Sequence, residues 1–290
     1  MNMSALFSRH RVAVATAVSL GAMTTMATAA SAATLKVTIE NLAPENGSLL
    51  TPAWVGFHDG TFDLYDRGES LDGFPGVEEL VEDGNNEPLT EAFAASNPDG
   101  VQGTLLSDGP PPLEVGESTS FTFEVDPTNQ YFSYAAMVLP SNDAFIANGN
   151  PFAHEIFDDA GNFLGADFVV LGSDVLDGGT EVNDELASST AFLGQAAPNT
   201  GTDENGVVAL HPGFIPDGRI LTTTDSSEFN GLPLNFTGAD FTAAGYQVAR
   251  FSVELVEDNV VEDVPEPGTI LGLLAAGGLV VAGRKRKQVA

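Results

Sequence analysis

The sequence predicts an all-β protein, an antiparallel β-sandwich with one or two short helices. Three observations predict it: short segments in which apolar and polar residues alternate, frequent Gly, Pro, Asn and Asp turns between them, and only two stretches with helical spacing. Alternation places every second side chain on one face of a strand, as in a sheet with one buried face. Many such strands and few helices favour two packed sheets.

Five segments are predicted as the main strands. The segments 34–40, 120–125 and 250–257 alternate apolar and polar residues, which predicts half-buried strands. The segments 131–140 and 167–172 are apolar almost throughout, which predicts strands at the centre of a sheet.

Two stretches have the spacing of helices. The stretch 75–84 begins near Pro75, carries its apolar residues on one side and ends at Gly84. A second short helix is predicted at 88–96.

The first residues have the pattern of a secretory signal. Arg9 and Arg11 give a basic start, a small and apolar run follows, and Ala30-Ser31-Ala32 is a small-x-small cleavage site. We therefore predict a signal peptide at 1–32. The alternative is a buried N-terminal helix.

The last residues combine a Pro-Glu-Pro breaker at 265–267, an apolar stretch at 269–283 and a basic end at 284–287. The apolar stretch is shorter than the about 20 residues that span a bilayer, so it would sit there marginally, with the basic end on the cytoplasmic side.

This tail, 265–290, resembles the PEP-CTERM sorting signal of bacteria. The resemblance implies export to the envelope surface or the medium of a Gram-negative-type bacterium. It also implies transient membrane insertion of a C-terminal transmembrane helix and processing by an exosortase-type enzyme. The alternative is a plain membrane anchor.

The body between the two signals is strongly acidic. Residues 33–264 contain 4 basic and 40 acidic residues, and the chain has no cysteine. Such a body repels nucleic acid and anionic lipid, so neither is expected as a partner, and no disulfide holds the fold. We predict one domain at 33–256 and an acidic linker at 257–264.

The segment 174–185, with the sequence DVLDGGTEVNDE, places five acidic residues in one loop, and no Lys or Arg occurs from Gly68 to Gly218. A hard cation is the simplest compensator, and calcium prefers oxygen ligands. Asp177 and Glu181 flank a flexible Gly-Gly pair and are predicted as ligands. The EF-hand order is absent, so further ligands would come from another loop.

A second loop, LPSNDAF, offers Asp143 just after an apolar strand. Together with DVLDGGTE, LLTPAWVGFHDGTFDLYDRGES and GVEELVEDGN, it resembles the spondin N-terminal domain over residues 34–256. The resemblance implies a C2-like β-sandwich with a calcium site, and it carries the metal role to Asp143, Asp177 and Glu181.

The remaining acidic residues of the loop, Asp174, Asp184 and Glu185, are predicted as rim charges. The alternative for the whole cluster is a set of solvated loop residues.

No pattern for catalysis is recognised. The histidines His58, His154 and His211 lie in different segments without zinc-site spacing, and neither GxSxG nor a phosphate-binding loop occurs. His58 is predicted to fix a loop by hydrogen bonding, and Trp54 to lie in the core.

The first hypothesis is an exported, non-enzymatic, calcium-binding β-sandwich that acts in adhesion or matrix assembly at the cell surface. Its partner would be a surface glycan or matrix protein. The alternatives are a secreted polysaccharide-active hydrolase and a structural envelope protein whose charge confers solubility in salt.

Overall fold

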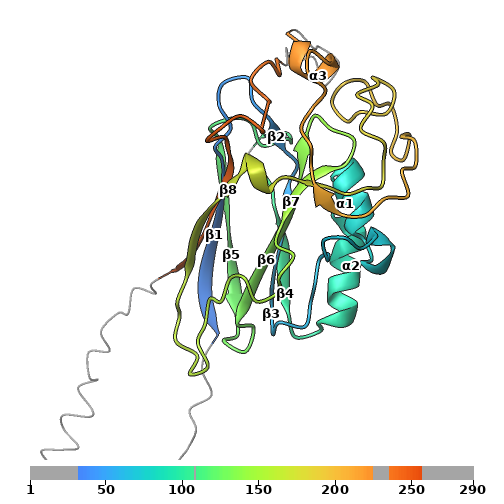
Figure 1. The fold of residues 1–290 in the computed structure, drawn as a ribbon. Coiled ribbons are helices and arrows are strands. Elements are labelled where there is room, and N and C mark those ends of the chain that lie inside the picture. The colour runs from blue at the N-terminus through green and yellow to red at the C-terminus, as the bar shows by residue number, and fades with distance from the viewer. Residues whose placement is uncertain (1–31, 108, 225–234, 257–290) are drawn as a thin grey trace, which may run out of the picture.

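The computed structural model describes residues 32–107, 109–224 and 235–256 of the 290-residue chain. Two antiparallel sheets pack face to face, and two helices cover one of them (Figure 1). The predicted all-β sandwich with few helices is confirmed.

The first sheet has four strands, in the order β5 (Ser118–Val125), β1 (Ala33–Asn41), β11 (Gln247–Leu255) and β8 (Ala166–Leu171). The second sheet follows the order β10 (Ala209–Leu210), β9 (Leu176–Asp177), β7 (Ala144–Ala147), β6 (Tyr131–Leu139), β3 (Ala53–His58) and β4 (Val101–Leu105). A short strand, β2 (Leu49–Leu50), also pairs with β6.

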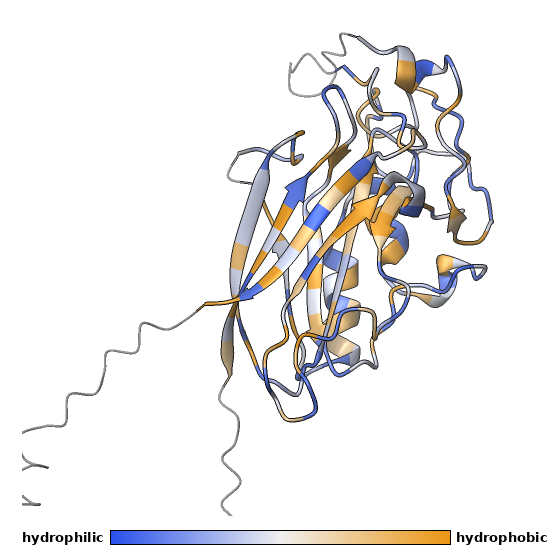
Figure 2. Cartoon of the chain, turned by 60° about the vertical axis from the view of Figure 1, so that its left-hand side comes forward, coloured by the Kyte–Doolittle hydropathy of each residue, from blue (hydrophilic) through white to orange (hydrophobic). Residues whose placement is uncertain are grey.

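The alternating pattern of β1 decides which face of the first sheet is buried. Leu35, Val37 and Ile39 are buried, whereas Lys36 between them is exposed. The antiparallel register places Val37 opposite Val253 of β11, so the apolar positions of both strands share one face. Figure 2 shows the same change of hydropathy from residue to residue along strands of the sandwich.

An aromatic cluster joins the two sheets. The ring centroids of Phe251 in β11 and Tyr134 in β6 lie 4.3 Å apart, and Phe251 also packs against Phe132. His154 stacks on Phe168 of β8 with centroids 3.8 Å apart and lies near Tyr134. Large rings from both sheets therefore fill the space between them.

The helices α1 (Val77–Asp83) and α2 (Glu87–Ser96) cover the outer face of the second sheet (Figure 1). Leu80 of α1 and Phe93 of α2 are buried in one cluster with Trp54 of β3. The two helices predicted from the sequence are confirmed within three residues at each end, and Trp54 is a core residue as predicted.

Glycines make the ends of α1 possible. Gly76 has φ +82°, and a Cβ there would lie 2.2 Å from the backbone N of Leu89, so no other residue fits against α2. Gly84 has φ +66° and donates its N–H to the Leu80 carbonyl at 2.9 Å, which ends the helix.

One strand prediction is only half right. The strand β6 lies in the middle of the second sheet as predicted for 131–140, but β8, predicted from 167–172 as a central strand, lies at the edge of the first sheet. Val169 and Leu171 of β8 are 37% and 41% exposed. An apolar run alone does not distinguish an edge strand with exposed valines from a central strand.

The remaining chain is mostly irregular, with two short 3₁₀ turns, η1 (Leu71–Gly73) and η2 (Gly172–Asp174), and a short helix, α3 (Arg219–Thr222). Leu193 and Ile220 form a buried cluster with Met137 and Leu139 of β6. The loop-rich segment before α3 is therefore packed onto the sandwich.

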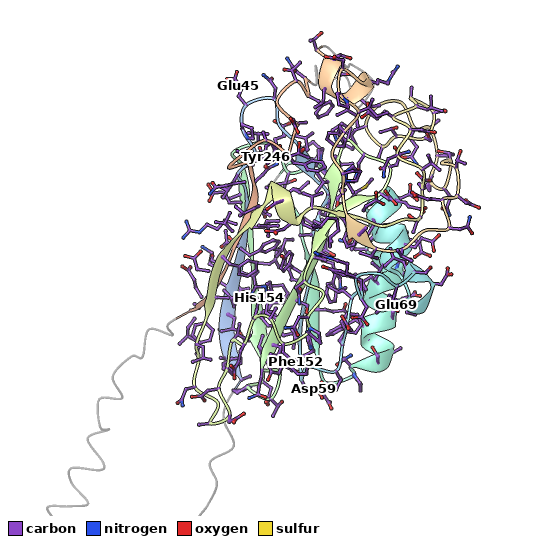
Figure 3. The ribbon with its side chains drawn as sticks, in the orientation of Figure 1. Glu45, Asp59, Glu69, Phe152, His154 and Tyr246 are labelled. Carbon is purple, nitrogen blue, oxygen red and sulfur yellow. The ribbon has the colours of Figure 1, made fainter. Side chains whose placement is uncertain are left out.

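The two ends of the sandwich differ. Leu35 and Leu255 are paired, so the described chain begins and finishes at the same end (Figure 1). The opposite end contains the β2 pairing with Leu139 of β6. In Figure 3, Glu45 and Tyr246 mark that opposite end.

The predicted signal peptide at 1–32 except Ala32, the acidic linker at 257–264 and the sorting tail at 265–290 lie outside the described residues. In the described parts of the chain, no helix is long and apolar enough to cross a membrane.

We predict that Phe251→Ala lowers the free energy of unfolding by about 3–5 kcal/mol, because it leaves a cavity between the sheets. Urea unfolding measures this. The control is Val169→Ala at the partly exposed edge strand, which is expected to cost less than about 1 kcal/mol. Equal losses in both variants would contradict the assignment of Phe251 to the core.

Candidate cation site

Asp143 lies at the turn between β6 and β7, where the chain reverses direction. The Ser141 hydroxyl donates to the Val138 carbonyl at 2.6 Å and accepts the N–H of Ala144 at 3.1 Å. The N–H of Ala191 donates to the Ser141 carbonyl at 3.1 Å. These bonds fix the turn and direct Asp143 into the protein, where it is 0% exposed.

The Asp143 carboxylate is bound by the acidic loop. Its Oδ2 accepts the N–H of Thr180 at 2.9 Å, the Thr180 hydroxyl at 3.2 Å and the N–H of Glu181 at 3.2 Å. Its Oδ1 is buried and has no hydrogen-bond partner. One oxygen of a fully buried carboxylate is thus left without a donor, which is costly.

Asp177 lies in the strand next to the turn that carries Asp143. It is opposite Ala144 in the pairing of β7 with β9, and the next residue, Gly178, donates its N–H to the Asp143 carbonyl at 3.2 Å. Burial first, and then the charge of Asp177, raises the pKa of Asp143 to about 7. The structure therefore brings Asp143 and Asp177, from separate loops, to neighbouring positions of the sheet.

The Asp177 carboxylate is held within its own loop. Its Oδ1 accepts the N–H of Gly179 at 2.8 Å, and its Oδ2 accepts the Asn183 amide at 2.7 Å. Gly179 is needed, because it has φ +66° and a Cβ there would lie 2.6 Å from the backbone N of Val207. At Gly178 a Cβ would lie 3.2 Å from Asp143 Oδ2, which is a tight contact.

Glu181 contributes its backbone N–H to Asp143, but its carboxylate has other neighbours. Its Oε1 accepts the N–H of Gly201 at 2.8 Å, and its Oε2 is buried without a partner. Burial raises its pKa, the N–H of Gly201 and the side chain of Asn142 lower it, and the charge of Asp83 raises it further.

The three predicted ligands therefore do not form one cluster. Asp177 pairs with Ala144, and the neighbouring Gly178 is the residue on the Asp143 side of the strand, whereas the Glu181 carboxylate lies against Gly201. Among the residues that the structure describes, no group of three or more His, Cys, Asp or Glu side chains is placed to hold a metal ion.

One further buried acidic residue is part of this region without having been predicted. Glu82 of α1 is 4% exposed, and burial raises its pKa to about 7 despite a hydrogen bond from the Thr180 side chain. Thr180 thus lies close to both Asp143 and Glu82. No signal in the sequence separates Glu82 from the other acidic residues of its helix.

Glu185 is not a rim charge, contrary to the prediction. It is 5% exposed, and its two oxygens accept the N–H groups of Ile215 at 2.7 Å and Ile220 at 3.0 Å. The prediction was wrong because these partners lie at least thirty residues away in the sequence. Asp174 is exposed as predicted, and Asp184 is half-buried.

Burial lowers the pKa of His58, His154 and His211 to about 4 each. His58 Nδ1 accepts the N–H of Gly60 at 3.0 Å, and its Nε2 lies 2.8 Å from the Ser133 hydroxyl. Since Nδ1 accepts, Nε2 carries the proton and donates to Ser133. His58 fixes a loop, as predicted, and is not a base for that serine.

Comparison with protein families shows where the protein is localised. The model of the PEP-CTERM protein-sorting motif matches residues 263–287. The chain carries a bacterial sorting signal. It is therefore exported to the cell surface, and an exosortase processes its C-terminus. No curated protein matches the chain.

We predict that Asp143 makes stability depend on pH. Because its pKa is higher in the folded protein than the ordinary 3.8, its contribution is full below pH 3.8 and is lost as pH rises towards 7. Without divalent cations, the wild type should lose stability relative to Asp143→Asn by about 1.4 kcal/mol per pH unit in this window.

Urea unfolding from pH 4.5 to 7.5 in a chelator measures the difference. The asparagine keeps an acceptor for Thr180 and does not ionise, and Glu82 is present in both proteins. Parallel stability curves for the two proteins would show that Asp143 is ionised with an ordinary pKa.

Proposed function

We propose that this surface protein is a non-enzymatic binding module that uses calcium to order the loops at one end of its sandwich. It would act in adhesion or matrix assembly, with a surface glycan or matrix protein as partner. The observation that carries the proposal is the pair of Asp143 and Asp177, in which a fully buried oxygen of Asp143 has no hydrogen-bond donor.

The chemistry of the pair favours a hard cation. Both side chains offer carboxylate oxygens, which calcium prefers, and the pair comes from a stretch of about 150 residues without Lys or Arg. Burial first, and then the charge of Asp177, raises the pKa of Asp143. A bound cation would offset the repulsion between the two carboxylates. It would also supply a partner for Asp143 Oδ1, which has no hydrogen-bond donor.

The fit is incomplete for the third predicted ligand. Glu181 has one buried oxygen without a partner, which leaves it an acceptor for a cation, but that carboxylate lies against Gly201. Asp143 and Asp177 are therefore the proposed core of the site, and Glu181 is the proposed ligand that depends on a change of side-chain orientation.

The position of the pair supports presentation of a binding surface. Asp143 follows the Leu139 end of β6, which is opposite to the end where β11 leads into the sorting tail. Loops ordered by the cation would face away from the processed C-terminus. The resemblance to the spondin N-terminal domain, which rests on the quoted motifs, supports the same role by analogy.

Binding is favoured over polysaccharide hydrolysis by the accessibility of the pair. A glycosidase needs two carboxylates that contact the sugar, one of them with a raised pKa. Asp143 has the raised pKa, but it is 0% exposed, so a polysaccharide cannot reach it in this structure.

We predict that calcium raises the melting temperature of the full-length protein and that Asp177→Asn removes the increase. Calcium at 100 times its dissociation constant stabilises the folded state by about 2.7 kcal/mol. Thermal unfolding with calcium and with chelator measures it, and isothermal titration gives the stoichiometry.

The matched control is Asp174→Asn, an exposed position of the same loop that does not contact the pair. It should keep the calcium response. A melting temperature that ignores calcium in the wild type, or an equal loss of response in both variants, would contradict the site.

We predict that deleting Pro265-Glu266-Pro267 abolishes C-terminal processing and reduces surface display. The short segment lies inside the matched sorting motif, where the processing enzyme must recognise the chain. Immunoblots of cell fractions, with protease shaving of intact cells, measure both effects. Thr269→Ala is the control and should be processed normally; full processing of the deletion variant would contradict the prediction.

A further inference from the structure

One strand edge of the sandwich is both long and unpaired. Four strands lie at the edges of the two sheets: β5, β8, β4 and β10. The edges of β4 and β5 lie against each other, because a Cβ at Gly103 of β4 would lie 2.7 Å from the Phe123 ring of β5. The strand β10 has only two residues. In contrast, β8 has six residues, pairs only with β11 among the described strands, and follows the left margin of the sandwich in Figure 1.

The backbone of β8 directs hydrogen-bonding groups away from β11. The N–H of Leu171 donates to the Asp174 carboxylate at 3.2 Å and not to β11. Because the backbone direction alternates along a strand, the N–H and C=O groups of Asp167 and Val169 point the same way. In the described parts of the chain, no backbone hydrogen bond reaches these groups. An edge of this kind is a template for another strand.

The features that usually protect an edge strand are missing from β8. It contains neither Lys nor Pro, and the register shift in its pairing lies on β11. Its one charged residue, Asp167, is paired within the same sheet, because Arg250 Nε donates to Asp167 Oδ1 at 2.7 Å and Arg250 Nη2 donates to Oδ2. Val169 and Leu171 expose apolar side chains on the same strand. The strand therefore offers an apolar edge whose own charge is already compensated.

We propose that β8 pairs antiparallel with β8 of a second copy of this chain, so that the two four-stranded sheets become one continuous sheet. A two-fold axis perpendicular to the sheet at Val169 keeps the outer faces of both sheets on the same side. In this register Val169 faces Val169 of the second copy, and Asp167 faces Leu171 of the second copy. No like charges of β8 then face each other, so the strand is complementary to itself.

The distribution of charge favours this face for a second copy. Residues 33–264 contain 4 basic and 40 acidic residues, so most surfaces of two copies repel each other. Two of the four basic residues, Lys36 and Arg250, lie on the outer face of the first sheet, where they pair in register with Glu254 and Glu40. Repulsion between two first sheets is therefore weaker than between surfaces without Lys or Arg. Added salt should strengthen the contact further.

Antiparallel pairing directs the C-termini of the two copies to opposite ends of the joined sheet. Ala166 at the start of β8 pairs with Val253, close to Leu255, the last residue of β11 before the sorting motif. Two copies on facing cell surfaces fit this arrangement, whereas two neighbours on one surface would need parallel C-termini. This role in adhesion rests on the proposed function, but the strand pairing itself needs no calcium.

Sedimentation equilibrium of the full-length protein in a chelator tests the pairing. We expect a monomer–dimer equilibrium that added salt strengthens. One strand pair buries less surface than a standard interface, so the dimer should be weak and depend on protein concentration. Hydrogen exchange of the segment 166–171 should become slower as the concentration rises, because the N–H of Val169 gains a partner. Since calcium is absent, failure of this test is distinct from failure of the cation site.

Two substitutions at Val169 target the edge. Val169→Lys places two like charges opposite each other at the two-fold axis, although it lowers the net negative charge of each copy. Val169→Pro removes an N–H that β11 does not use, at an edge position where proline is tolerated. Each should weaken dimerisation at least about tenfold. Melting temperatures show whether the variants are folded, and Val169→Lys decides alone if the proline variant is not.

The matched control is Leu210→Lys, which makes the same change of charge at an exposed apolar residue of the other open edge, β10. It should change the dimerisation constant less than about threefold. A monomer at every concentration and salt overturns the proposal. A dimer that persists in the folded Val169 variants also overturns it, because the contact would then lie elsewhere.

Beads that carry the protein through its C-terminus test the relative direction of the two copies. Beads with the wild type should clump in chelator, and beads with Val169→Lys should stay apart. A dimer in solution without clumping of the beads overturns the arrangement on facing surfaces.

Discussion

The constraint on which the loop-rich end of this protein depends is the burial of carboxylates in a region that contains no Lys or Arg from Gly68 to Gly218. Backbone N–H groups take the place of lysine and arginine. Asp143 accepts those of Thr180 and Glu181, and Glu185 accepts those of Ile215 and Ile220. Each carboxylate thereby joins a loop to a distant segment.

This arrangement links stability to charge. A carboxylate that accepts backbone N–H groups is partly compensated, yet burial still raises the pKa values of Asp143 and Glu82 to about 7. Thr180 lies between these two groups, so the acidic loop connects the turn after β6 with α1. A cation at the pair would therefore stabilise the junction of the acidic loop, the turn after β6 and α1. This is the physical reason for the proposed calcium dependence.

This junction lies at the end of the sandwich opposite to the start of β1 and the end of β11. The aromatic cluster around Phe251 holds the two sheets together without using any of the acidic residues. The chain enters β1 and leaves β11 at the other end of the sandwich, towards the motif at 263–287. Apolar packing thus stabilises the core, whereas electrostatic interactions decide the stability of the acidic end.

The sequence by itself determined the sandwich, the two helices, the burial of Trp54 and the sorting motif. The spacing of apolar residues, the turn residues and the order of residues in a motif are all local properties of the chain. The shared cation site of Asp143, Asp177 and Glu181, which the sequence suggested through a resemblance, stays a prediction. Only the tertiary structure decided that β8 is an edge strand, that Glu185 is buried and that the Glu181 carboxylate lies against Gly201. These depend on which backbone donors the fold brings within reach, and such donors come from segments far away in the sequence.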